Sequence, residues 1–136
     1  ILLENYRSIK IKSSSFSIPA DYTIKETTDK ILIANDDCTV EYQTQETLDH
    51  FCEQVKLRSA AEGVIMRNTA VQSEWINGIK CYQQIYVVQV GEENFLAVGV
   101  YLDQEKDASL FAFVPYSMGT KVLRDVFHKI IITLDS

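Results

Sequence analysis

The chain has 136 residues, of which 46% are hydrophobic and 24% charged, and it carries a formal net charge of −6. This length and composition predict one folded domain spanning residues 1–136 and exclude a disordered tail. The scattered basic residues argue against a nucleic acid partner, because binding to phosphates depends on clustered Lys and Arg side chains.

The N-terminal part of the chain predicts short β-strands. Residues 9–18 place apolar side chains at alternate positions, with a polar interruption in the middle, and Pro19 ends the pattern because it cannot donate to a strand ladder. Residues 30–34 form a short apolar strand that stops at an Asn-Asp-Asp turn. Residues 38–43 alternate strictly between apolar and polar side chains, which predicts a half-buried strand.

An amphipathic helix is predicted next. Thr44 is a suitable N-cap, and Gly63 is a suitable residue to end the helix. Between them, apolar side chains follow the spacing i, i+3, i+4 and i+7, which places them on one face of a helix. This stripe consists of Leu48, Phe51, Cys52 and Val55.

Residues 64–116 change to a period of two, which is typical of strands. Asn77-Gly78 is a strong hairpin signal, because both residues accept the positive φ of a type I′ turn. The other connections are short, so neighbouring strands should be antiparallel. The four strands expected here are 64–76, 79–90, 95–102 and 109–116.

A second amphipathic helix is predicted from about Thr120 to the β-branched residues 130–133. Its wide apolar stripe consists of Val122, Leu123, Val126, Phe127, Ile130 and Ile131.

Both faces of the central strands are apolar. In the strand 79–90, Cys81 and Ile85 point to one face, whereas Tyr82 and Tyr86 point to the other. Each face therefore needs a cover, and the two amphipathic helices can supply one each. The predicted fold class is α+β: an antiparallel sheet of about six to seven strands with a helix on each face, in the order β-β-β-α-β-β-β-β-α.

Three landmarks together resemble the PsbP-like superfamily. The first is Phe16-Ser17-Ile18-Pro19 with Tyr22, where this family often has an F-x-I-P-x-x-aromatic opening. The second is Ile76-Asn77-Gly78-Ile79, which leads into an aromatic strand, and the third is 127–131, which resembles the closing helix of the family. The fold is shared by the extrinsic photosystem II subunit, a Ran-binding import factor, bacterial lipoproteins and secretion adaptor chaperones.

This resemblance implies an α/β/α sandwich that binds a protein or a ligand and has no catalytic site. The chain has no acidic Ran-binding signature and is shorter than the photosystem subunit, so neither of those activities is carried over. No functional residue of the family can be transferred position by position.

The cysteines predict neither a cofactor site nor a metal site. Cys38, Cys52 and Cys81 match no zinc or redox spacing, and Cys-x-x-Cys is absent. Three separated thiols favour a reducing, cytoplasmic compartment. An extracytoplasmic or lipid-anchored location is the alternative if a leader once preceded Ile1. No apolar run approaches the ~18 residues that a membrane-spanning helix requires.

Catalysis by a cysteine is the least favoured function. A nucleophilic thiol needs a histidine, a cation or a helix start to lower its pKa, and the sequence places none of these beside Cys81. We therefore expect Cys81 to be a buried side chain. A small enzyme in which folding pairs Cys81 or Cys52 with His50 or His128 remains an open alternative.

The leading hypothesis is a non-enzymatic binding or adaptor domain with a protein or peptide partner. Aromatic residues of the strands are the candidate binding residues, since aromatic patches mark interaction surfaces. The alternative is an acidic inhibitor or immunity-type protein that neutralises a basic enzyme. The candidate partner-binding residues are Trp75, Tyr82, Tyr86 and Tyr101.

Overall fold

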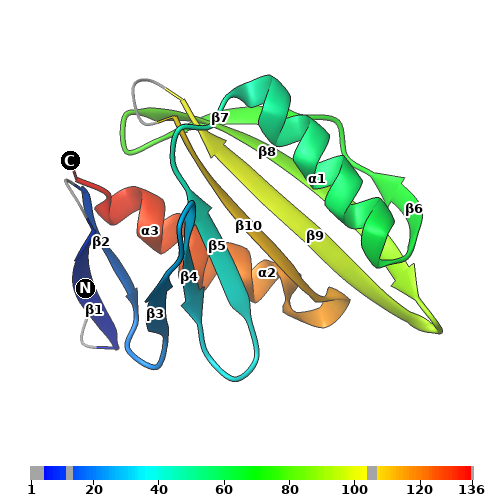
Figure 1. Ribbon diagram of the computed structural model, residues 1–136, viewed down its shortest axis with the longest axis horizontal. Helices are drawn as coiled ribbons and strands as arrows, with labels where there is room; N and C mark the ends of the chain where they lie inside the picture. Colours follow the sequence, from blue (N-terminus) through cyan, green and yellow to red (C-terminus); the bar gives the residue numbers. More distant parts are fainter. Residues whose placement is uncertain (1–4, 12–13, 104–106, 136) are drawn as a thin grey trace.

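A computed structural model describes residues 5–11, 14–103 and 107–135 (Figure 1). The described residues form antiparallel strands and two helical regions, which confirms the predicted α+β class. In chain order, the elements are β1 (Tyr6–Ile11), β2 (Ser14–Pro19), β3 (Thr23–Glu26), β4 (Lys30–Ala34), β5 (Thr39–Gln43), α1 (Leu48–Glu62), β6 (Val64–Asn68), β7 (Gln72–Ile76), β8 (Ile79–Val90), β9 (Glu93–Leu102), β10 (Ala108–Pro115), the 3-10 turn η1 (Tyr116–Met118), α2 (Gly119–Val122), the π-helical turn η2 (Leu123–Phe127) and α3 (His128–Thr133).

Within the described residues, the main sheet has eight strands: seven in the order β3-β4-β5-β10-β9-β8-β6, and β7, which also pairs with β8. Every pairing is antiparallel, whereas β1 and β2 form a separate hairpin. The sheet is wider than the predicted six to seven strands. One extra strand is β3. It was not predicted because Ile24 is the single apolar residue among its four, so the sequence shows no apolar alternation there, and the other three side chains are exposed.

The predicted strand 64–76 is divided into β6 and β7, which pair with successive parts of β8. Thr69 lies in the break and keeps this edge attached to the sheet. Its N–H donates to the Ile85 carbonyl at 2.9 Å, and its hydroxyl oxygen accepts from the Ile85 N–H at 3.0 Å. The turn that follows is as predicted, with φ of 53° at Asn77 and 71° at Gly78.

Helix α1 begins later than predicted, and Thr44 is not its N-cap. Gln45 has a φ of 57°, and the Glu46 N–H donates to the Asp107 carbonyl, so this segment is not yet helical. Thr47 is the N-cap, and its hydroxyl oxygen accepts from the His50 N–H at 3.2 Å.

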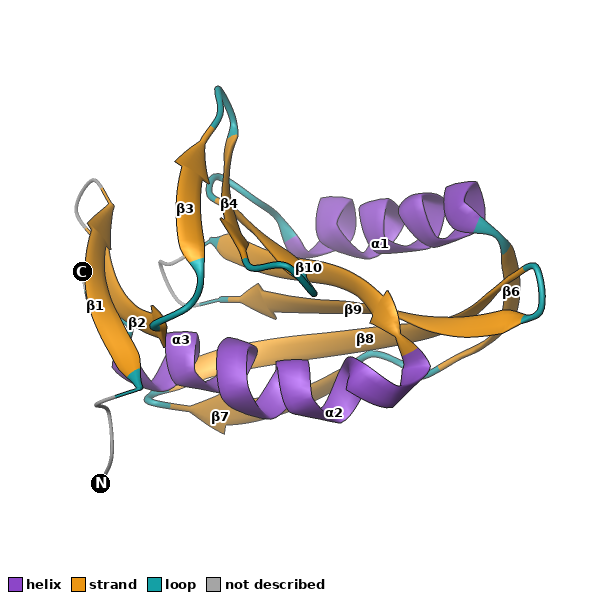
Figure 2. Ribbon diagram, turned by 90° about the horizontal axis from the view of Figure 1, so that it is seen from below, coloured by secondary structure: helices purple, strands orange, loops and turns teal. Residues whose placement is uncertain are grey.

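The two faces of the sheet have different covers (Figure 2). The larger core cluster lies between one face and the C-terminal helical region α2–η2–α3, with the β1–β2 hairpin packed beside it. Phe127, Ile130 and Ile131 of this region are fully buried. The smaller cluster lies under α1 on the opposite face and includes Phe51 and Val55. The prediction of one helix on each face is therefore confirmed.

Candidate binding surface

The α1 side of the sheet is only partly covered. A helix is about 10 Å wide and strands lie about 4.8 Å apart, so one helix covers roughly two strands. Helix α1 packs against β8, β9 and the neighbouring β6. Among the described residues, no helix lies in front of β10, β5 and β4 on this side (Figure 1). The opposite face of the sheet is covered by both the C-terminal helical region and the β1–β2 hairpin.

Three phenylalanines lie on the α1 side of the sheet, where the cover of the helix gives way to the open strands, and we call them the phenylalanine shelf: Phe95 of β9, and Phe111 and Phe113 of β10. The rings of Phe95 and Phe113 stack, with centroids 5.1 Å apart and an interplanar angle of 8°. Both of these side chains are half-buried. Phe111 is only 9% exposed, because it belongs to the cluster beneath α1 and the guanidinium of Arg58 lies over its ring at 4.1 Å. The shelf therefore offers partly accessible aromatic surface in the absence of a covering helix.

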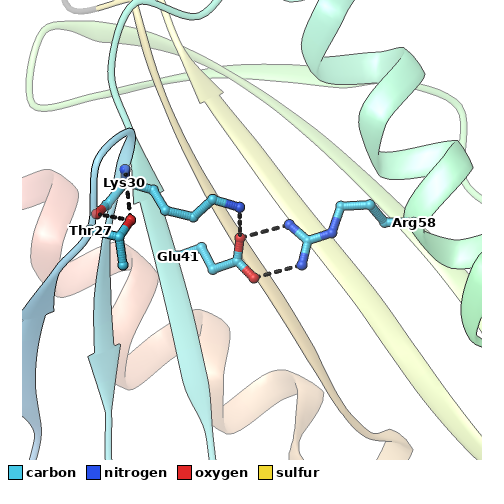
Figure 3. Close-up of polar contacts among 4 residues, drawn as sticks. All are labelled: Thr27, Lys30, Glu41 and Arg58. Carbon is cyan, nitrogen blue, oxygen red and sulfur yellow. Dashed lines mark hydrogen bonds and ion pairs between the residues drawn. The ribbon is translucent and has the colours of Figure 1, made fainter.

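A charged network joins α1 to the open strands (Figure 3). Arg58 donates two hydrogen bonds to the Glu41 carboxylate, at 2.7 and 2.6 Å, and Lys30 Nζ donates a third at 3.0 Å. Burial alone would raise the pKa of Glu41, but the hydrogen bonds from Arg58 and Lys30 outweigh it and lower the pKa. This network holds the Arg58 side chain in place over the shelf.

Glu41→Gln is expected to lower the free energy of unfolding by about 1 kcal/mol at neutral pH, a small effect because the ion pairs are partly exposed. The folded-state pKa of Glu41 is depressed, so its contribution is present above the unfolded pKa and is lost as the pH falls through the folded one. Urea unfolding of both proteins should show the difference vanishing in acid. Glu53→Gln, at an exposed position of α1, is the control. A difference that persists in acid would contradict the role of the Glu41 charge.

The four candidate residues from the sequence lie on this same side of the sheet, but they differ in accessibility. Tyr86 and Tyr101 are 6% and 4% exposed and belong to the cluster beneath α1. Tyr82 is half-buried, with Lys80 Nζ 5.5 Å from its ring centroid. Trp75, on the edge strand β7, is 60% exposed. A partner could therefore reach Trp75 and part of Tyr82, whereas Tyr86 and Tyr101 shape the surface from below.

The shelf residues were not identified as candidates from the sequence. The sequence does indicate on which side of the sheet they lie, because alternation within β9 and β10 places Phe95 and Phe113 on the same side as Tyr101. The position of α1 over β8 and β9, which leaves Phe113 of β10 partly accessible, depends on the strand order of the folded sheet.

An open groove lies on the opposite side of the sheet, between β6 and the turn after β10. Its volume is about 750 Å³, and its lining includes Met66, Val87 and Tyr116. Met66 and Tyr116 are 55% and 48% exposed. One guanidinium nitrogen of Arg67 donates to the Tyr116 hydroxyl at 3.2 Å. This groove combines exposed apolar side chains with polar ones, including Arg67 and Glu93, and supplies a comparison site for the shelf.

Folding does bring Cys81 and His128 to one cavity, of about 180 Å³, between the β7–β8 hairpin and the C-terminal helical region. The geometry does not activate the thiol. Cys81 is 3% exposed, and its Sγ donates to the Ile79 carbonyl at 3.5 Å. Burial, followed by the charge of Glu74, raises the pKa of the Cys81 thiol to about 11. Cys81 is thus a buried thiol, as predicted, and is protonated at neutral pH.

Iodoacetamide is expected to modify Cys52 first in the native protein, because Cys52 is half-buried whereas Cys38 and Cys81 are buried. Alkylation requires the thiolate, so Cys81 should become reactive only as the pH rises towards 11 or when the protein is denatured. Peptide mass spectrometry after labelling with and without denaturant measures each site. Rapid modification of native Cys81 at neutral pH would restore the catalytic interpretation.

The described residues contain no group of three or more His, Cys, Asp and Glu side chains placed to hold a metal ion. Among the same residues, none of the helices combines the length and the apolar character needed to cross a bilayer.

No protein-family model matches the chain, and no curated protein matches it in sequence. The structure is similar to the solution structure of cyanobacterial PsbP (CyanoP) from Synechocystis, with a TM-score of 0.62 and 10% identity over 96% of this chain and 92% of that chain. It is also similar to LpqN, which is involved in cell envelope biogenesis of Mycobacterium tuberculosis, with a TM-score of 0.51 and 9% identity over 89% and 81% of the two chains. The chain therefore has a PsbP-like fold.

Proposed function

We propose that this chain is a non-enzymatic binding domain whose protein or peptide partner docks on the α1 side of the sheet. The observation that carries the proposal is the phenylalanine shelf, an aromatic surface that one helix leaves open. Aromatic side chains at the centre of an interface contribute much of its binding energy. Phe113 and Phe95 are half-buried and stacked, so they are ordered before a partner arrives, which reduces the entropy lost on binding.

A binding role is favoured over catalysis because Cys81, which shares a cavity with His128, is buried and its raised pKa keeps the thiol protonated at neutral pH. CyanoP and LpqN share the architecture at about 10% identity, and a binding role is compatible with that architecture.

Trp75 and Tyr82 form the second part of the proposed surface. They lie at the β7 edge of the same side, so a long partner could contact both this edge and the shelf. Tyr86 and Tyr101 support the surface rather than touch the partner, since both are buried beneath α1. The Tyr101 hydroxyl donates to Asp107 Oδ1 at 3.1 Å, which fixes that end of the sheet to the segment before β10.

Variants of exposed aromatic residues test the proposal. Phe113→Ala is expected to lower the amount of captured partner about tenfold, and Trp75→Ala to lower it less, because truncation of a central aromatic typically costs 1–2 kcal/mol or more. Tyr116→Ala removes an exposed aromatic from the opposite side and serves as the matched control. Affinity capture with quantitative mass spectrometry measures the loss, and circular dichroism verifies folding. If only Tyr116→Ala lowers the amount of captured partner, the binding site lies on the opposite face of the sheet.

An acidic inhibitor of a basic enzyme is a narrower form of the same proposal, favoured by the net charge of −6. It predicts that association slows steeply as salt is added, because opposite charges steer the encounter. An association rate that does not change with salt would rule out the acidic inhibitor and would not affect the wider proposal of a binding domain.

A further inference from the structure

A shallow hollow adjoins the phenylalanine shelf and joins it to an acidic turn. It has a volume of about 310 Å³, and its lining includes Asp36 and Asp37 of the β4–β5 turn together with Phe111 and Phe113 of β10. Arg58 provides the only positive charge among its described lining residues, and its guanidinium is bound to Glu41. The hollow therefore combines aromatic surface with excess negative charge.

The acidic turn has a fixed shape. Asn35 Oδ1 accepts hydrogen bonds from the N–H groups of Asp37 and Cys38, both at 2.9 Å, and Asn35 Nδ2 donates to Asp21 at 3.1 Å. Asp36 and Asp37 are exposed, and within the described part of the chain neither carboxylate takes part in an ion pair. The fixed turn thus places two exposed carboxylates beside the hollow, and neither is engaged by a described cationic side chain.

The protein already binds one guanidinium beside this hollow in the same chemical setting. Arg58 lies over the Phe111 ring at 4.1 Å while a carboxylate accepts both of its hydrogen bonds. An aromatic face stabilises a cation, and a carboxylate matches the planar fork of a guanidinium. Phe113 lies two residues further along β10, and the acidic turn lines the same hollow. Phe113 and the carboxylates of the acidic turn thus form a second combination of an aromatic ring with carboxylates, which suits a second guanidinium.

We propose that this hollow binds an arginine side chain of a basic protein segment. The inference rests on the proposed binding function and specifies the chemistry of the partner. Arginine is favoured over lysine because a planar guanidinium can stack on Phe113 while it donates to the carboxylates of the turn. The net charge of −6 would attract a basic segment over the Debye length before the side chain enters the hollow.

The direct test uses hexa-arginine and hexa-lysine peptides, with affinity measured by fluorescence anisotropy at physiological salt. Asp36→Asn with Asp37→Asn is expected to weaken hexa-arginine binding about tenfold, since two partly exposed ion pairs are lost. The matched control is Glu92→Gln with Glu93→Gln. It makes the same change of net charge at the exposed β8–β9 turn, which Figure 1 shows well away from the β4–β5 turn. This control should weaken binding by less than about twofold.

A third variant tests the aromatic part of the proposal. Phe113→Leu should weaken hexa-arginine binding about threefold and leave hexa-lysine binding nearly unchanged, because the contact with the ring face is lost. Thermal unfolding of each variant verifies that the fold persists, and chemical shifts of residues 36–39 and 111–113 should move when hexa-arginine is added to the wild-type protein.

Equal loss of affinity in the two acidic double variants would overturn the inference, because it would show attraction by net charge alone. Equal affinity of the wild-type protein for the two peptides would also overturn it. The two proposals fail separately: if Phe113→Ala abolishes partner capture while hexa-arginine does not bind the hollow, the arginine inference is wrong and the shelf remains a binding surface for a partner of different chemistry.

Discussion

Phe127→Ala is expected to lower the free energy of unfolding by about 3–5 kcal/mol, the largest effect of a single substitution that we predict. Phe127 lies in the π-helical turn of the C-terminal helical region and has no exposed surface. Its ring belongs to the larger core cluster between this region and the sheet, so truncation both removes buried apolar surface and leaves a cavity. Domains of this size are stable by only about 5–15 kcal/mol, so the variant should unfold at much lower urea concentration.

Ile132→Ala is the matched control for this prediction. Ile132 lies in the same helical region and is 47% exposed, so its truncation should change the free energy of unfolding by less than about 0.5 kcal/mol. Urea titrations followed by circular dichroism compare the two. A loss below about 1 kcal/mol for Phe127→Ala would show that this helical region contributes little to the stability of the core.

Gly99→Ala is expected to destabilise the protein by about 1–3 kcal/mol through overpacking beneath α1. A Cβ at this position would lie 2.8 Å from Val55 Cγ2 and 2.9 Å from Phe51 Cε1, which is closer than such atoms can approach. Glycine at this point of β9 allows the helix to lie close to the sheet. A methyl group would push α1 outwards or force both side chains out of their rotamers.

A second substitution can test the cause. Phe51→Leu removes ring atoms that a Cβ at position 99 would meet, so the double variant should be more stable than the sum of the two single losses predicts. Urea unfolding of the four proteins completes the cycle. Strict additivity would mean that Gly99→Ala acts through strand propensity instead of through contact with α1.

The central layers of the fold could be predicted from the sequence because they depend on periodicity. Cys81 and Ile85 lie in or against the larger cluster, whereas Tyr82 and Tyr86 lie in or against the smaller one, as the alternation indicated. The turn at Asn77-Gly78 was predictable for a local reason, since few other pairs tolerate positive φ at both positions. The second helix was predictable from its wide apolar stripe.

Other elements depend on contacts that are distant in sequence. The break between β6 and β7 is bridged by hydrogen bonds between Thr69 and Ile85, and the late start of α1 involves the hydrogen bond from Glu46 to Asp107. Short strands such as β3 gain their stability from pairing with a neighbour rather than from their own pattern.

The candidate site was predictable only in part, for a geometric reason. The sequence shows which side of a strand is apolar, but not how many strands one helix has to cover. With eight strands in the described part of the sheet, the single helix α1 leaves the β10, β5 and β4 side uncovered, so Phe95 and Phe113 are partly accessible whereas Tyr86 and Tyr101 are buried. The meeting of Cys81 and His128 also depends on how the C-terminal helical region lies on the sheet.

The most direct test of the central claim is site-specific photo-crosslinking in cells that express the chain. A photoreactive phenylalanine analogue would replace Phe113 on the shelf or Tyr116 beside the groove on the opposite side. We predict a discrete crosslinked partner from position 113 and little or none from position 116. A partner that crosslinks at position 116 and not at position 113 would show that the open α1 side of the sheet is not the binding surface.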